Sequence, residues 1–251
     1  MKSILTRLGS QAINELAETF RFLGGVLAVW FVMVTFLFAA FHIPSESMQP
    51  ALQVGDRVLV SKFSYGYSRH SLPLGIGYLI PDRWAGRVFG GMPERGDVIV
   101  VRDPGQEVNL IKRVIGLPGD RIEVRRGRLF INDDMVPRIP DGEVEYRDRT
   151  GVVVRAAVYT ETLPGGDIHT IYERSDSEHL DDVGPFMVPA DNLFLMGDNR
   201  DASADSRFAS GLGYVHKDEV VGQAWTVLFT FASCREEPGM FCPGWRVWKG
   251  I

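Results

Sequence analysis

Two short polar segments hold residue types that could carry covalent chemistry. The segment "IPSESMQPAL" (43–52) has two serines between two prolines, and "MGDNRDASADSR" (196–207) follows a short apolar run. In the second segment Ser203, Asp205 and Arg207 occupy alternate positions. If the segment is extended, these side chains share one side, as an ion pair with a hydroxyl beside it. A serine hydroxyl becomes an effective nucleophile when a neighbouring base takes its proton, so a hydrolase built on these serines requires a base.

Two kinds of base are available in the sequence. Histidine is one, at positions 42, 70, 169, 179 and 216, and a Ser-His-Asp triad stays open because its members can come from anywhere in a chain, although no G-x-S-x-G motif supports it. Lysine is the other, but its ordinary pKa is about 10.4, and it accepts a proton only where burial lowers that value. Lys112 lies within the apolar run "NLIKRVIGL" and is the candidate. The alternative is a lysine on the solvent face of a strand.

The polar segments must be held by a membrane anchor and a β domain. Residues 22–41, "FLGGVLAVWFVMVTFLFAAF", carry no charge and as a helix would span about 30 Å, one bilayer core. We interpret this run as a transmembrane helix, because a cleaved signal peptide has an apolar region of about 7–15 residues and an A-x-A site, which "FLFAAFHIP" lacks. Lys2, Arg7 and Arg21 precede the run and the next basic residue after it is Arg57, so the positive-inside rule predicts a cytoplasmic N-terminus.

The rest of the chain is predicted to be mainly β. Short apolar runs with a period of two end at turn residues and predict strands within 57–65, 96–104, 110–120, 121–133, 151–163, 192–200 and 220–231. We therefore expect a single transmembrane helix followed by a β ectodomain with a second β lobe inserted. The predicted parts are a cytoplasmic segment 1–21, the anchor 22–41, a catalytic β core from 42–124 and 190–251, and an inserted β lobe 125–189.

Composition excludes some classes of protein. The net charge of −5 and the lack of a basic block argue against nucleic-acid binding. Cys234 and Cys242 are either a disulfide outside the cytoplasm or free thiols. Two cysteines do not make a zinc site, and no metal or organic cofactor is expected.

Taken in order, four blocks of the sequence resemble the type I signal peptidases, the membrane-bound Ser/Lys endopeptidases that remove signal peptides. The blocks are "IPSESMQPAL" (43–52), "GDRVLVSKFSYG" (55–66), "RGDVIVVRDP" through "IKRVIGLPGDRIEV" (95–124) and "MGDNRDASADSR" (196–207). The likeness covers most of residues 43–231 and implies a signal-peptidase-like β ectodomain behind its anchor.

The resemblance implies a role for each matching position. Ser47 matches the nucleophile, Lys112 the general base, and Ser45 the hydroxyl that completes the oxyanion site with the Ser47 amide. Ser203 matches the hydroxyl that orients the lysine, and Met48 a substrate-binding position. The remaining matches are a supporting network of Asp205, Arg207 and Arg200, with Gly197 and Asp198 as wall and turn positions. Glu46 and Ala202 stand where the family often has glycine and asparagine, which puts the substrate preference in doubt.

The implied activity is cleavage of preproteins after small residues at Ala-x-Ala-like sites, at the outer face of the plasma (inner) membrane. The expected partners are preproteins that carry signal peptides, membrane lipid and, transiently, the secretion translocon. Pro44 and Pro50 disfavour helix around the serines, so we expect them in an extended, accessible strand edge beside the anchor. The substrate would add to an exposed edge as an extended strand.

Two other functions remain open at this point. One is a Ser/Lys protease dedicated to a single substrate, such as a conjugation-linked maturation peptidase; a self-cleaving cytosolic repressor does not fit the anchor. The other is a membrane-tethered β module that binds envelope partners without catalysis. The binding-module interpretation predicts that Ser47 and Lys112 can be replaced without any effect on a chemical reaction.

Overall fold

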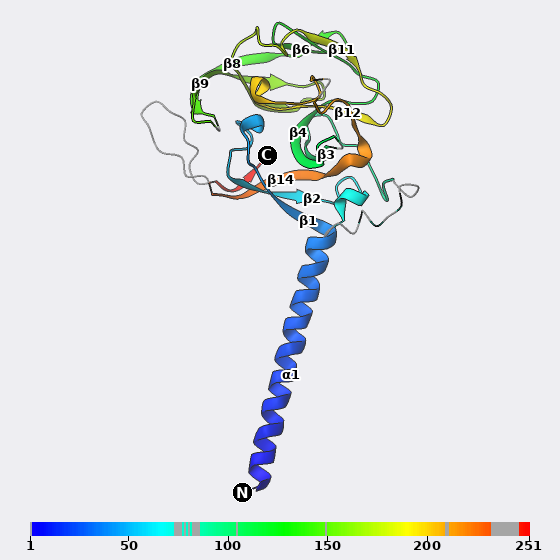
Figure 1. Cartoon of the computed structure of the whole chain (residues 1–251), viewed down its shortest axis with the longest axis vertical. Coiled ribbons are helices and arrows are strands. Elements are labelled where there is room, and N and C mark those ends of the chain that lie inside the picture. The colour runs from blue at the N-terminus through cyan, green and yellow to red at the C-terminus, as the bar shows by residue number, and fades with distance from the viewer. Residues whose placement is uncertain are drawn as a thin grey trace.

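A long N-terminal helix stands out from a β body in the computed structural model (Figure 1). The structure describes residues 2–72, 77, 79, 81, 86–103, 105–148, 150–208, 211–231 and 246–251, with side chains from residue 14 onward. Cys234 and Cys242, for which a disulfide or free thiols were predicted, lie outside the described residues. Helix α1 (Lys2–Val32) continues as one π-helical turn, η1 (Met33–Leu37). The segment Asn14–Leu37 is long and apolar enough to cross a membrane and is almost wholly exposed, which fits a single-pass anchor.

The helix ends at Leu37 and not at Phe41, where the apolar run predicted its end. Strand β1 (Phe38–His42) pairs antiparallel with β2 (Asp56–Ser61) along its whole length. The Lys62 side chain donates hydrogen bonds to the carbonyls of Val34 and Thr35, at 3.2 and 3.3 Å, in the last turn. The prediction failed because "FAAFH" is as apolar as the anchor, and the partner strand that makes it β lies further along the chain.

The largest sheet lies next to the helix and has the strand order β1-β2-β14-β3-β4-β12-β13, with β15 paired to β14 (Figure 1). All its described pairings are antiparallel. Its remaining strands are β3 (Val98–Asp103), β4 (Val108–Gly116), β12 (Asn192–Met196), β13 (Val215–His216), β14 (Val220–Thr230) and β15 (Val247–Gly250).

Two smaller sheets lie farther from the helix (Figure 1). One has the order β10-β9-β8 and the other β11-β5-β6-β7. Their strands are β5 (Arg121–Arg125), β6 (Arg128–Ile131), β7 (Asp134–Met135), β8 (Arg138–Arg147), β9 (Val153–Thr162), β10 (Ile168–Glu173) and β11 (Val183–Met187). Short 3-10 turns complete the described elements: η2 (Glu46–Met48), η3 (Arg69–Ser71), η6 (Arg200–Ala202) and η7 (Lys217–Glu219).

The predicted fold class is confirmed: the chain is mainly β with one apolar N-terminal helix. Each of the seven predicted runs contains a strand, whereas seven described strands lie outside them: β1, β7, β8, β10, β11, β13 and β15. The β8 run "RIPDGEVEYR" carries charges, a proline and a glycine, which are depleted in strands, and it forms because β9 pairs with it. The domain limits, including the inserted lobe 125–189, stay a prediction.

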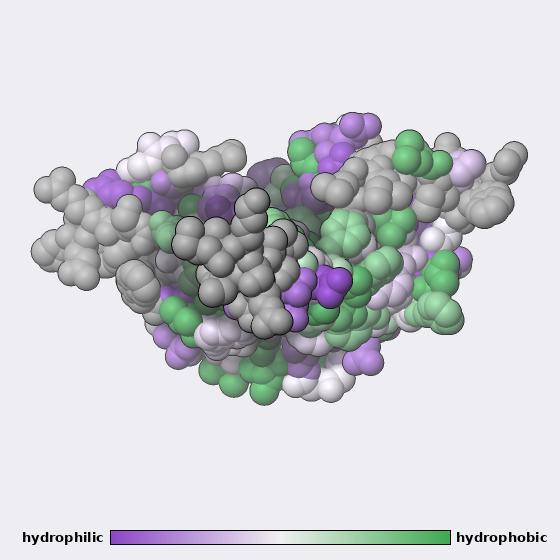
Figure 2. Space-filling model, turned by 90° about the horizontal axis from the view of Figure 1, so that it is seen from below, coloured by the Kyte–Doolittle hydropathy of each residue, from purple (hydrophilic) through white to green (hydrophobic). Residues whose placement is uncertain are grey.

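The core next to the helix packs the serine segment against the large sheet. Ile43, Met48 and Leu52 are buried among valines of β2, β3 and β14. Because each buried apolar side chain of this size contributes about 1.5–3 kcal/mol, this packing fixes the backbone on both sides of Ser47. Seen from the helix side, hydrophobic residues gather around the base of the helix (Figure 2). Just past the helix end, Phe38 forms edge-to-face pairs with Phe63 and Trp225, which also pair with each other; the ring centroids are 5.4–5.8 Å apart.

Candidate active site

Ser47 and Lys112 meet between the turn η2 and strand β4. The Lys112 Nζ atom donates a hydrogen bond of 2.8 Å to Ser47 Oγ. Only 7% of Ser47 and 3% of Lys112 is exposed. In the described part of the chain, Lys112 and Ser45 are the side chains that hydrogen-bond to the Ser47 side chain, and no histidine does so. The pair has the arrangement of a nucleophile beside a base.

The surroundings of Lys112 favour its neutral form. Burial lowers the pKa of Lys112 to about 8, although the carboxylates of Asp205 and Asp198 work in the opposite direction. A desolvated ammonium loses its hydration, and two carboxylates at the site compensate for only part of that loss. Lys112 can therefore be neutral at mildly alkaline pH and can then accept a proton from the hydroxyl 2.8 Å away.

The serine segment is more buried than expected. Ser45 is extended (φ −133°, ψ 159°) and half-buried, with its Oγ atom 3.4 Å from Ser47 Oγ. Ser47 itself lies in the 3-10 turn η2, so the expectation of an extended, accessible edge for both serines is wrong. The turn forms because Met48 is buried in the core, while the Gln49 amide closes the turn on Glu46 O at 3.0 Å.

The loop between β12 and η6 holds the backbone of this turn. The Asn199 amide donates to Ser47 O at 3.1 Å, and its side-chain Nδ2 donates to Glu46 O at 3.2 Å. The same Nδ2 atom donates to the Tyr146 hydroxyl at 2.9 Å, which ties the turn to β8. A Cβ atom on Gly197 would lie 2.4 Å from Ser47 O, so this position requires glycine for close approach.

Asp205 and Arg207 form a buried, bidentate ion pair, as their alternate spacing predicts. Arg207 Nε and Nη2 donate to the two carboxylate oxygens of Asp205 at 2.9 and 3.0 Å. Asp205 also accepts from the Gly197 amide at 3.0 Å, and Arg207 donates to the Arg200 carbonyl. Burial would raise the pKa of Asp205, but the charge and hydrogen bonds of Arg207 outweigh it and lower that pKa. A charged Asp205 thus fixes Gly197 against Ser47.

Ser203 lies close to the Ser47 backbone but makes no side-chain hydrogen bond with Ser47 or Lys112. Its Oγ atom is buried and has no hydrogen-bond partner among the described residues. An added Cβ on Gly197 would lie 2.4 Å from this Oγ atom, which shows that Ser203 packs on the same side of Gly197 as Ser47 O. The role of Ser203 in orienting Lys112 stays a prediction.

Two further buried ion pairs surround the site. Arg113 donates to both oxygens of Asp198 at 2.7 and 2.8 Å, and to the Gly96 carbonyl at 2.7 Å. Arg200 pairs with Glu161 of β9. Burial would raise the pKa of Glu161, but Arg200, with help from His169, lowers it to about 2. Neither Arg113 nor Glu161 was predicted as a site residue; the signal for Arg113 is a second basic residue inside the same apolar strand.

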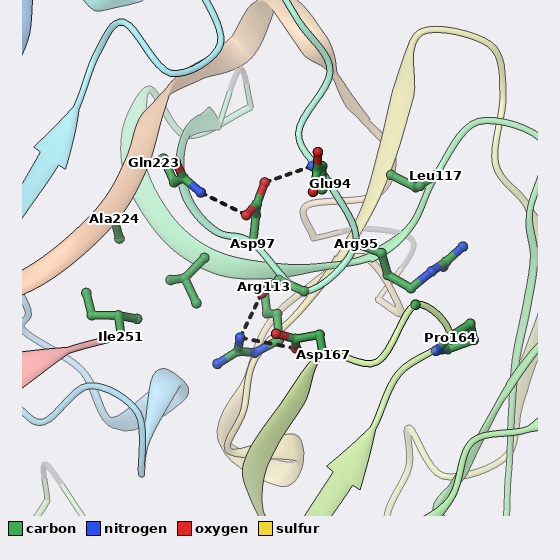
Figure 3. Close-up of a pocket in the computed structure, with 13 residues that line it drawn as sticks. Glu94, Arg95, Asp97, Arg113, Leu117, Pro164, Asp167, Gln223, Ala224 and Ile251 are labelled. Carbon is green, nitrogen blue, oxygen red and sulfur yellow. Dashed lines mark hydrogen bonds and ion pairs between the residues drawn. The ribbon is translucent and has the colours of Figure 1, made fainter.

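A cavity of about 550 Å³ opens beside β4 (Figure 3). Arg113 and Asp167 line one part of it, and Asp97 accepts from Gln223 Nε2 and from the Glu94 amide, both at 2.8 Å. Ser47 and Lys112 do not line this cavity. Partly buried Phe41, Ile111 and Ile251 pack against the core cluster that includes Met48, and Ile251 also lines the cavity.

Comparison with known proteins gives one consistent family. A model of the family described as "Signal peptidase, peptidase S26" matches residues 16–229. Signal peptidase I from Rickettsia typhi is 34% identical over 212 residues, 82% of this chain and 77% of that protein. Signal peptidase I from Pseudomonas aeruginosa is 37% identical over 211 residues, 80% of this chain and 68% of that protein.

A solved structure of a signal peptidase I from Enterococcus faecalis V583 is also similar, with 25% sequence identity and a TM-score of 0.32; the match covers 53% of this chain and 97% of that one. The family match spans both the anchor and the β body, and the two relatives are similar over about four fifths of the chain. The chain therefore belongs to the signal peptidase family, peptidase S26, and is a serine peptidase that processes signal peptides at a membrane.

Proposed function

We propose that Ser47 is the nucleophile and Lys112 the general base, and that the chain cuts preproteins after small residues at Ala-x-Ala-like sites. The observation that carries the proposal is the buried 2.8 Å hydrogen bond between Lys112 Nζ and Ser47 Oγ. A lysine pKa of about 8 supports it, because the base has to be neutral when the serine attacks.

In the proposed reaction, neutral Lys112 takes the Ser47 proton as Oγ attacks the carbonyl carbon of the scissile bond. The negative charge on the carbonyl oxygen is stabilised by the Ser45 hydroxyl and the Ser47 amide, and loss of one such donor typically costs about 10²–10³ in rate. The lysine then gives the proton to the leaving amine, which leaves an ester on Ser47. It next takes a proton from water, whose oxygen attacks the ester carbonyl, and returns that proton to Ser47 Oγ as the ester bond breaks.

The apolar residues around the dyad suit small substrate side chains. Met48 follows the nucleophile, and the half-buried Phe41 and Ile111 pack on the same cluster. Side chains already packed to this degree leave shallow recesses, which favours alanine over larger residues at the positions one and three before the cut. A bulky residue there would have to displace part of the core, which typically costs about 1–3 kcal/mol.

The anchor fits the proposed location of the reaction. Ser47 follows closely after the end of the helix at Leu37, so the site would lie near the bilayer surface. Lys2, Arg7 and Arg21 precede the apolar run 22–41, and by the positive-inside rule they support a cytoplasmic N-terminus, with the β body facing outward, where signal peptides emerge. Contacts with lipid at the base of the helix and transient contact with the translocon belong to the same proposal.

The test is cleavage of a preprotein with an Ala-x-Ala site by the detergent-solubilised chain, with products identified by mass. We expect a cut after the second alanine, and a fall of about 5- to 150-fold in kcat/KM, equivalent to about 1–3 kcal/mol, when either alanine is replaced by phenylalanine. Ser47→Ala should abolish cleavage, whereas Ser177→Ala, at an exposed serine, should leave it unchanged. Cleavage by Ser47→Ala at the wild-type rate would refute the nucleophile, and indifference to the alanines would refute the specificity.

A further inference from the structure

Three carboxylates converge away from the dyad, where the smaller sheets meet the active-site loop. Glu173 ends β10, Asp181 lies between β10 and β11, and Asp201 lies in η6. One oxygen of each carboxylate lies within 4.8 Å of the others. The three residues come from separate segments, so the tertiary fold brings them together.

The carboxylates of Glu173 and Asp181 are buried, that of Asp201 is half-buried, and all three are incompletely bonded. Only 2% of Glu173 and 1% of Asp181 is exposed, and each of the three residues has one buried oxygen with no hydrogen-bond partner among the described residues. In Asp181 and Asp201 the other carboxylate oxygen accepts a hydrogen bond from a backbone amide. The Glu178 amide donates to Asp181 at 2.6 Å, and the Arg174 amide donates to Asp201 at 2.7 Å. The backbone bonds hold the side chains in place while the free oxygens lack a donor, which typically costs about 1–3 kcal/mol or more per group.

The nearby arginines offset only part of the charge of this group. Arg138 forms a buried ion pair with Glu173 at 3.6 Å, but it also pairs with Asp176 at 2.7 Å, and Arg200 is paired with Glu161. Two buried carboxylates and the half-buried carboxylate of Asp201, with oxygens within 4.8 Å of one another, therefore need either a shared proton or a metal cation.

We propose that Glu173, Asp181 and Asp201 form a binding site for a divalent cation with oxygen ligands, with Ca²⁺ as the expected ion. Three carboxylates without histidine or cysteine suit Ca²⁺ better than Zn²⁺, and Mg²⁺ is seldom held by an all-protein cage. Water would complete the coordination. The site is separate from the dyad, and the proposal does not rest on the proposed mechanism.

A cation here would link two parts of the molecule that build the active site. Asp201 lies in the same 3-10 turn as Arg200, two residues before Ser203, whereas Glu173 and Asp181 belong to the region of the smaller sheets. A bound ion would hold the loop against that region, in addition to the hydrogen bond of Asn199 with Tyr146. The cation would then stabilise the folded loop and change activity only indirectly.

The experiment is a titration of the full-length, detergent-solubilised chain, first stripped with EDTA, with CaCl₂ by calorimetry and in parallel by thermal unfolding. We expect one saturable site and a rise in Tm of about 5–10 °C when Ca²⁺ exceeds Kd a hundredfold. Tb³⁺ luminescence excited through tyrosine locates the ion, because Tyr172 precedes Glu173 in β10. Tyr172→Phe should weaken the luminescence and leave the affinity for Tb³⁺ unchanged.

Glu173→Gln with Asp181→Asn should abolish Ca²⁺ binding, while Asp133→Asn, at a carboxylate that is 72% exposed, should retain it. In EDTA the double variant should unfold at or above the wild-type Tm, because like charges have been removed. If the double variant does not fold, Asp201→Asn takes its place. No saturable Ca²⁺ binding and a wild-type Tm indifferent to Ca²⁺ would overturn the proposal and indicate a shared proton. Unchanged binding in the variants would also overturn it.

Discussion

At the residue scale, the site depends on how burial changes ordinary side chains. A lysine at the surface keeps its proton, but Lys112 is buried in β4 and its pKa falls to about 8. Ser47 is equally enclosed, so the hydrogen bond between them is not exchanged for water. Neither residue is unusual by type, and what makes the pair a candidate dyad is the apolar strand and turn that carry it.

The lowered pKa of Lys112 predicts the pH dependence of cleavage. Only neutral lysine can take the serine proton, so kcat/KM should rise with pH, about tenfold from pH 6 to pH 7, and level off above about pH 9. Initial rates on a peptide without ionisable groups near the cut, in buffers from pH 6 to 10, measure the profile. A flat or falling profile over this range would show that a neutral Lys112 is not required.

Gly197 offers a test of the close contact at the dyad. In Gly197→Ala the new Cβ atom would lie 2.4 Å from Ser47 O, and neither backbone can yield without moving the serine. We expect at least a 10²-fold fall in kcat/KM and a loss of about 1–3 kcal/mol in stability. Gly91→Ala, where an added Cβ meets nothing within 4 Å, is the matched control and should behave as wild type. Equal activity of the two variants would contradict the described packing.

At the element scale, the active-site loop is positioned by contacts with strands far away in the sequence. Asn199 joins Glu46 O of η2 to the Tyr146 hydroxyl of β8, and Arg200 joins the loop to Glu161 of β9. These contacts place the smaller sheets behind the loop as its support. A change in β8 or β9 should therefore reach the dyad through this loop.

A double-mutant cycle on Asn199 and Tyr146 measures that coupling. Asn199→Ala and Tyr146→Phe each remove one side of a 2.9 Å hydrogen bond between buried groups. We expect each single change to lower the free energy of unfolding, and the double change to cost about 1 kcal/mol less than the sum. Chemical unfolding of the four proteins gives the coupling energy. Strict additivity would mean that β8 does not support the loop.

Much of this arrangement was predictable, and the failures have physical causes. Strands such as β2, β3 and β14 follow from local apolar patterns, and the Asp205–Arg207 pair follows from alternate spacing. The ion pairs Arg113–Asp198 and Arg200–Glu161 join residues far apart in the sequence, so no local sequence pattern predicts them. The strand β1 and the turn η2 also depend on tertiary contacts, with β2 and with the buried Met48, which override the local preference for helix or extended chain.

At the scale of the whole molecule, the anchor and the exposed aromatic residues at the base of the β body both indicate contact with a membrane. Phe63 and Trp225 are 40% and 42% exposed and pack on Phe38, just past the helix end. Exposed aromatic residues beside a membrane anchor are typical of contact with the interfacial region of a bilayer. The dyad would then work at the membrane surface and not in bulk solution.

Replacing both Phe63 and Trp225 by serine tests this contact. We expect a several-fold fall in cleavage of a preprotein inserted in lipid vesicles, and little change with a short soluble peptide, because the dyad itself is untouched. The ratio of the two rates, measured for wild type and variant, isolates the effect of the membrane. An equal fall with both substrates would indicate damage to the fold, and no fall with either would contradict lipid contact.

The most direct test of the central claim is a comparison of kcat/KM for Ser47→Ala, Lys112→Met and the double variant on one preprotein. Groups that act as a single unit are strongly non-additive, so the account predicts that the two single variants and the double variant fall to the same residual rate. Circular dichroism of each variant checks that it is folded. If the double variant falls by the product of the two single effects, or if either single variant keeps the wild-type rate, Ser47 and Lys112 do not form the catalytic dyad.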